Sequence, residues 1–177
     1  MRATSVTVAA LVAALLLTAC DDGGAGGDSQ DKDSKAGSAC EVGEVAVRVG
    51  PANAAPAAGD TGNVPVTLTN GGDSTCVLDG MPGVDLHTGA GAAAVEPDKG
   101  AVARKTTLAK GASTSFTLTY VRGEEGGGRS LAVETAKMRL PGSTKTHSFT
   151  WSYGAVALRS DGKTPDASVS GFQQSGD

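Results

Sequence analysis

The chain has 177 residues, of which 15 are basic and 19 acidic, and aromatic residues make up only 3% of it. This length suits one domain with a targeting segment. Without Arg2 and the acidic segment at residues 21–39, twelve basic and fourteen acidic residues remain. This near-neutral balance lacks the basic footprint that nucleic-acid binding requires, so we expect no nucleic-acid partner.

The N-terminus predicts an exported, lipid-anchored protein. Arg2 gives a short positive start, and residues 6–17 are almost wholly apolar, which is too short to span a membrane and typical of a signal peptide. Leu-Thr-Ala-Cys follows at residues 17–20 and looks like a bacterial lipobox, in which the cysteine thiol receives diacylglycerol. We expect residues 1–19 to be a lipoprotein signal peptide and Cys20 to carry the lipid anchor at the extracytoplasmic face of the cell membrane. An ordinary secretory signal with a chance cysteine is the alternative.

The segment after Cys20 predicts a tether. Residues 21–39 hold no large apolar side chain and are rich in Gly, Asp and Ser, so they cannot bury enough surface to offset the entropy of ordering. Five aspartates occur there at irregular spacing, which does not match a calcium-binding loop. We therefore assign residues 20–39 to the lipidated cysteine and a disordered tether. A disordered tail is expected at residues 174–177.

Residues 40–173 have the pattern of one all-β domain. Val45, Val47 and Val49 alternate with Glu44, Ala46 and Arg48, the period of a strand with one buried face. No segment shows a sustained helical period, so we expect an antiparallel Ig-like β-sandwich, with a helical turn at residues 132–138 as a minor alternative. Further strands are expected at residues 64–69, 76–78, 84–88, 101–108, 113–121, 131–140, 146–153, 156–158 and 167–172.

Glycine and proline predict the connections between these strands. Residues 50–62, 89–100 and 123–128 read as loops, and residues 70–73 and 79–83 as turns. Pro65 cannot donate a ladder hydrogen bond. Its strand is therefore expected to begin at a sheet edge or at the next residue.

The cysteines predict one disulfide. With Cys20 assigned to lipid, Cys40 and Cys76 remain in an exported chain, where disulfides persist. We predict a Cys40–Cys76 bond, which by loop entropy stabilises the fold by roughly 3–4 kcal/mol. Two free thiols or a metal site are the alternatives, although zinc prefers four ligands with paired local spacing.

The residues around the second cysteine resemble a known family. Residues 68–72 (LTNGG) and 76–84 (CVLDGMPGV) are similar to the patterns L-T-N-x-G and C-x-L-x-G-x-P-G-V of exported actinobacterial domains catalogued as domain of unknown function 4232. Residues 108–111 and 169–172 resemble later parts of the same pattern, so the resemblance covers about residues 40–172. It implies an extracytoplasmic β-sandwich, often on a lipoprotein, and no activity. Many members carry a second cysteine pair in the C-terminal half, which this chain lacks.

A catalytic site is not evident in the sequence. No G-x-S-x-G elbow is present. His87 or His147 would be the base of a hydrolase, but partly buried or strand-end histidines are the preferred interpretation. Carboxylate pairs for sugar chemistry come only from Gly- and Pro-containing loops, where solvated surface charge is the simpler interpretation: Glu96 with Asp98, and Glu124 with Glu125.

Three further binding sites can be drawn from the sequence. A copper carrier would use soft ligands, here without clustered spacing: Met81, Met138, His87 and His147. The alternating residues His147, Phe149, Trp151 and Tyr153 form one face of a strand, which would stack on a carbohydrate or peptide or, as we prefer, fill the core. The opposite face, from Thr146 to Ser152, would dock an extended segment if it lies at a sheet edge.

We therefore expect a non-enzymatic binding or interaction module at the cell envelope, with no cofactor. Its partners would be the membrane, through the lipid on Cys20, and an unknown envelope protein or polymer. The alternatives are an accessory or hydrolytic protein acting on cell-wall polymers, a copper carrier, and a purely structural surface protein. The loops at residues 89–100 and 123–128 are the expected places for binding.

Overall fold

The computed structural model describes residues 37–53 and 55–174, and this part of the chain is built from β-strands without a helix. The predicted signal peptide, Cys20, most of the tether and residues 175–177 lie outside the described residues. No membrane-crossing helix is therefore found in the described ranges. The strands are β1 (Ser38–Ala39), β2 (Val45–Val49), β3 (Thr61–Asn70), β4 (Cys76–Gly80), β5 (Gly83–Thr88), β6 (Gly91–Pro97), β7 (Arg104–Leu108), β8 (Ser113–Val121), β9 (Ser130–Leu131), β10 (Thr135–Arg139), β11 (Thr146–Thr150), β12 (Val156–Ala157), β13 (Ala167–Val169) and β14 (Gln173–Gln174).

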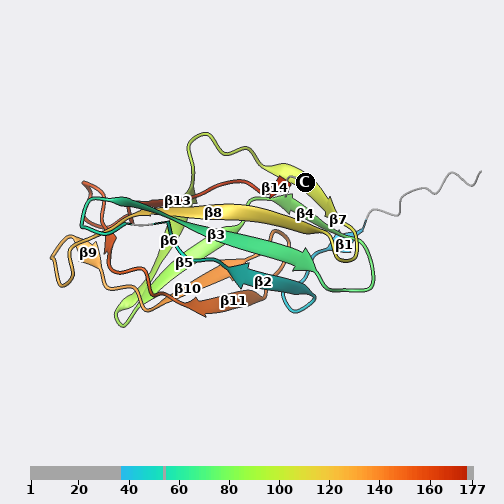
Figure 1. The fold of residues 1–177 in the computed structure, drawn as a ribbon, viewed down its shortest axis with the longest axis horizontal. Helices are drawn as coiled ribbons and strands as arrows, with labels where there is room; N and C mark the ends of the chain where they lie inside the picture. Colours follow the sequence, from blue (N-terminus) through green and yellow to red (C-terminus); the bar gives the residue numbers. More distant parts are fainter. Residues whose placement is uncertain (1–36, 54, 175–177) are drawn as a thin grey trace, which may run out of the picture. The chain divides into compact units, whose positions relative to one another are not determined.

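The largest sheet has the strand order β11-β10-β5-β6-β13-β8-β3-β2, and β14 also pairs with β8. Its two halves meet only through a short parallel pair, in which Ser168 and Val169 of β13 lie opposite Glu96 and Pro97 of β6. The long strands β3 and β8 run side by side through the domain (Figure 1). Two smaller sheets have the orders β1-β4-β7 and β12-β9.

Both halves of the large sheet contribute to one core. Leu86 of β5 and Met138 of β10 are fully buried, as are Val64 of β3 and Leu118 of β8, and all belong to one hydrophobic cluster. The predicted alternation is confirmed along β8, where every second residue is buried. The expected all-β sandwich is thus confirmed, because sheet faces with a period of two meet around a shared interior.

The disulfide closes the small β1-β4-β7 sheet. Cys40 follows β1 and Cys76 begins β4, and their sulfurs are bonded with the Cα atoms 4.9 Å apart. The Cys40 N–H also donates to the carbonyl of Val77 at 3.0 Å. The predicted Cys40–Cys76 bond is confirmed. Strand pairing starts at Ser38, two residues before the expected start of the domain.

Asn70 joins the end of β3 to the end of β7. Its buried side-chain amide donates to the carbonyls of Ser74 and Leu108, each at 2.9 Å, and its oxygen accepts from the Gly72 N–H. Its backbone carbonyl accepts from Gly111. The buried side chain of Asn70 therefore holds the turn predicted at residues 70–73, and it also holds the C-terminal end of β7.

The expected start of the Pro65 strand at Val66 is wrong, because β3 begins at Thr61. The other expectation, a sheet edge, holds locally, because β2 pairs with β3 no further than Val66. Pro65 lies within β3, which is flanked by β2 and β8. The Pro65 carbonyl accepts from the Gly50 N–H, and β2 has already ended at Val49. A residue's nitrogen and carbonyl point to the same side of an antiparallel strand, so the missing N–H faces the loop after β2 and removes no ladder bond.

The loop expected at residues 89–100 is largely a strand. β6 occupies Gly91–Pro97 and pairs with β5 from Val84↔Val95 to Thr88↔Gly91. Small residues give little strand signal and, in β6, only Val95 is buried. The neighbouring strand imposes the conformation that local preference does not indicate.

Other element boundaries also differ from expectation. The single strand expected at residues 131–140 is divided into β9 and β10, and the alternative helical turn there is not formed. The aromatic strand ends at Thr150, although the Trp151 N–H still donates in register to the carbonyl of Glu134. Two strand pairs are parallel, β1 with β4 and β6 with β13, which turn signals cannot predict because such partners are far apart in sequence.

Candidate binding groove

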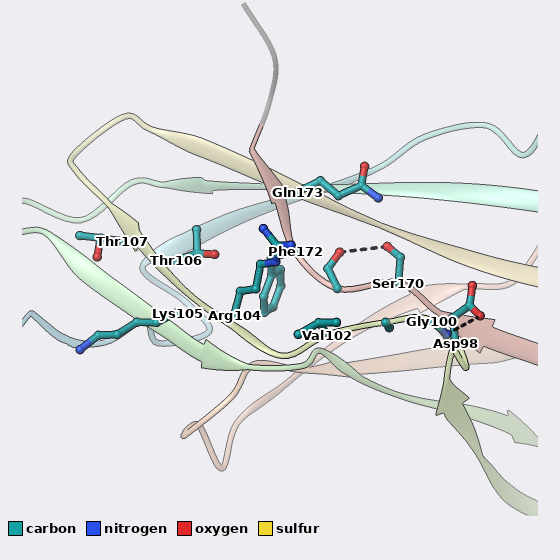
Figure 2. A pocket seen from close by; sticks show the side chains of 12 residues that line it. Asp98, Gly100, Val102, Arg104, Lys105, Thr106, Thr107, Ser170, Phe172 and Gln173 are labelled. Atoms are coloured by element: carbon teal, nitrogen blue, oxygen red, sulfur yellow. Dashed lines mark hydrogen bonds between the residues drawn. The ribbon is translucent and has the colours of Figure 1, made fainter.

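An open groove of about 800 Å³ separates β7 from the C-terminal segment (Figure 2). One wall is the chain that leads from the end of β6 into β7, and the other is the segment between β13 and β14. This volume lies in the range of about 300–1,000 Å³ that is typical of ligand pockets. The residues lining the groove are Asp98, Gly100, Ala101, Val102, Arg104, Lys105, Thr106, Thr107, Ser170, Gly171, Phe172 and Gln173.

The strand β7 presents an open edge to this groove. The Val77 carbonyl accepts from Cys40, so the peptide groups of Val77 face β1, on one side of β4. On the other side of β4 lies β7, where Thr107 is the residue opposite Val77. Because the peptide groups of Val77 face β1, Val77 and Thr107 exchange no backbone hydrogen bonds. The peptide groups of Thr107 and, by the period of two, of Lys105 point away from β4. In the described part of the chain, no strand pairs with this edge of β7.

The opposite wall is held firmly by β8. The Ser170 N–H donates to the Thr117 carbonyl at 3.0 Å, and the Ser170 hydroxyl accepts from the Thr117 N–H at 2.9 Å. Further along, the Thr114 hydroxyl donates to the Gln173 carbonyl at 2.7 Å. This wall is therefore anchored to the longest strand pair of the domain.

The groove has an apolar base and one close contact between its walls. Phe172 is 7% exposed, and its ring meets that of Phe116 edge to face, with 6.0 Å between centroids. Val102 is 63% exposed, and in the described ranges it is the one large apolar residue that is exposed. A Cβ at Gly171 would lie 3.0 Å from the Val102 carbonyl oxygen, so glycine permits the walls to meet there.

The charge in the groove is mainly positive. Arg104 is exposed, and its guanidinium has no ion-pair or hydrogen-bond partner within the described ranges. Lys105 lies opposite Asp79 of β4 and extends away from Arg104, Val102 and the ring in the groove (Figure 2). Asp98 accepts from the Gly100 N–H at 3.4 Å and so faces its own turn.

The candidate catalytic residues are dispersed. His87 occupies the outer face of β5, whereas His147 shares the inner face with its cross-strand partner Met138. The Glu96 carboxylate is paired with Arg159, and the Glu125 carboxylate accepts from the Ala155 N–H. Of the carboxylates considered, only Asp98 lines the groove, and Glu124 lies in an exposed turn.

The proposed soft ligands are also divided among different places. Met138 is fully buried beside His147, whereas Met81 lies near Gly171. Among the residues that are described, no group of three or more His, Cys, Asp or Glu side chains has the arrangement of a metal site. The geometry therefore assembles no set of ligands from the four residues considered.

The aromatic residues after β11 fill one end of the core. Trp151 is 6% exposed, and its ring lies 5.1 Å from that of Tyr120 and 4.8 Å from that of Tyr153. The Tyr120 hydroxyl donates to the Tyr153 carbonyl, and the Tyr153 hydroxyl donates to the Gly50 carbonyl. Burial raises the pKa of both tyrosines above 10.0. The preferred interpretation of Trp151 as a core residue is confirmed.

The groove was not predicted from the sequence. Binding was expected at the loops of residues 89–100 and 123–128, and only Asp98 and Gly100 of these line the groove. The available signal was Val102, an apolar residue in a Gly- and Ala-rich connection, followed by two adjacent cations in an extended segment.

These observations define a disulfide-bridged β-sandwich in which an unpaired strand edge borders a groove with an apolar base. The chain belongs to the family described as Domain of unknown function (DUF4232), whose model matches residues 40–173. This match confirms the resemblance of residues 68–72 and 76–84 and includes the C-terminal half, which contains no cysteine. No curated protein and no solved structure matches the chain.

Proposed function

We propose that this protein is a lipid-anchored, extracytoplasmic binding module of an actinobacterial cell envelope, without enzymatic activity, and that it holds its partner in the groove beside β7. The observation that carries the proposal is the open edge of β7 next to Val102. An unpaired strand edge offers peptide donors and acceptors, and an exposed apolar side chain gains from being covered.

The anchor is supported by the sequence before the domain. The Leu-Thr-Ala-Cys motif at residues 17–20 follows a short apolar run, and family resemblance favours an exported lipoprotein. Residues 21–37 would keep β1 within about 60 Å of a lipidated Cys20, even if fully extended. Mass spectrometry of the mature protein should find an acylated Cys20 at the N-terminus, and an unmodified, unanchored protein would contradict the anchor.

The groove can be tested by co-purification of the full chain from detergent-solubilised envelopes. Val102→Glu places a charge in the groove at an exposed residue, so the fold should remain intact. Ser148→Glu is the matched comparison, because Ser148 is exposed on the outer face of the edge strand β11, the alternative docking face that the sequence offers. The proposal predicts that envelope components bound by the wild-type chain are retained by Ser148→Glu and lost by Val102→Glu. Equal retention by both variants would contradict it.

A further inference from the structure

We propose that the groove takes an extended, acidic peptide segment, which adds as a strand to β7 and places a carboxylate at Arg104. This inference rests on the proposed function and names the chemistry of the partner. Three features of the groove lead to it: the direction of its free peptide groups, its unpaired guanidinium and its apolar base.

The peptide groups set the conformation of the partner. Lys105 and Thr107 each direct an N–H and a C=O away from β4, with the spacing of one strand repeat between them. An extended segment beside β7 satisfies both residues with ladder hydrogen bonds, as in other cases of strand addition. A compact polar ligand matches this repeat less well.

The charge sets the chemistry of the partner. Arg104 and Thr106 occupy the same face of β7 as the buried Leu108, and Arg104 lines the groove together with Phe172 (Figure 2). Its planar guanidinium is suited to a carboxylate, which it binds through two parallel hydrogen bonds. A basic segment would meet an uncompensated like charge.

The apolar base selects the neighbouring side chains. Residues of an added strand point alternately toward and away from the base, so those on the inner face meet Val102 and Phe172. A segment with aliphatic residues two positions before and two positions after its acidic residue would cover them, because all three share the inner face. Residues 21–36 of this chain are acidic but contain no large apolar side chain, so they fit the groove poorly.

A charged edge strand has another possible role. Lysine and arginine on an edge also deter pairing with a second chain. If the charges on β7 serve only to prevent strand pairing, no peptide should bind to β7, whatever the charge of the peptide. The two interpretations therefore differ in a direct binding measurement.

The probe is a fluorescein-labelled, amidated hexapeptide of sequence Thr-Val-Thr-Glu-Thr-Val, titrated with the full chain in detergent micelles. Two control peptides carry lysine in place of glutamate, or N-methyl groups at alternate peptide nitrogens. We expect the glutamate peptide to bind to the wild-type chain at least about tenfold more tightly than either control. Arg104→Glu should reverse the preference and favour the lysine peptide.

Several outcomes would overturn the inference. Failure of the glutamate peptide to bind, equal binding of the N-methylated peptide, or an unchanged preference in Arg104→Glu would each contradict it. A chain that dimerises through β7, with dimerisation abolished by Val102→Glu, would replace it with self-association. If the peptides fail while Val102→Glu still abolishes co-purification, the groove binds a partner of different chemistry and only this inference falls.

Discussion

Asn70 shows how one motif residue determines the position of the groove. Its amide reaches the carbonyl of Leu108 at the end of β7 and, through Gly72 and Ser74, shapes the turn that leads to Cys76. The sequence predicted a turn at this residue because asparagine and glycine accept turn conformations. It did not predict the contact with Leu108, because that contact joins segments 38 residues apart.

Replacement of Asn70 by alanine should destabilise the domain strongly. The variant loses three hydrogen bonds and leaves buried groups of the turn and of Leu108 without partners, so we expect a loss of about 2–4 kcal/mol in the free energy of unfolding. Asn63→Ala is the matched control on the same strand. Its side chain makes one hydrogen bond, with Thr119, so its loss should cost about 1 kcal/mol or less. Urea unfolding measures both, and equal losses would contradict this account of Asn70.

At the scale of the element, predictability followed the density of strand-forming residues. The bounds of β8 were predicted correctly, because Phe116, Leu118 and Tyr120 alternate with polar β-formers. β6 was missed because its Gly and Ala residues carry no such signal. The open edge of β7 was not predictable, since it depends on which strand lies on each side of β4.

The pairing of β7 makes a prediction about amide exchange. Thr106 faces β4 and its N–H is paired, whereas the amides of Lys105 and Thr107 face the groove. Hydrogen exchange measured by NMR on the free chain should therefore be about tenfold or more faster at Lys105 and Thr107 than at Thr106. Uniform protection along β7 would show that its outer edge is already covered.

At the scale of the whole molecule, we expect the stability of the fold to fall both at high pH and at low pH. Burial raises the pKa of Tyr120 and Tyr153, so the protonated tyrosines stabilise the fold fully below pH 10 and this contribution is lost as the pH rises above it. Hydrogen bonds from Thr164 and Lys163 lower the pKa of Asp161 from 3.8 to about 2. Its contribution is therefore present above pH 4 and is lost as the pH falls toward 2.

These directions can be measured with two substitutions. The midpoint of urea unfolding should fall above pH 10, and less steeply in Tyr153→Phe. Between pH 4 and 2 it should fall less steeply in Asp161→Asn than in the wild-type chain. Unchanged slopes in these variants would show that the assigned groups do not control the pH dependence.

The central claim is that the groove beside β7 is the surface that binds in the envelope. The most direct test is photo-crosslinking in intact cells, with p-benzoylphenylalanine at Val102 or, as the control, at Ser148. Both positions are exposed, but Val102 lies in the connection before β7 and lines the groove, whereas Ser148 lies on β11. The account predicts one defined crosslinked species from Val102, abolished by Arg104→Glu, and none from Ser148. The same species from both positions, or none from Val102, would contradict it.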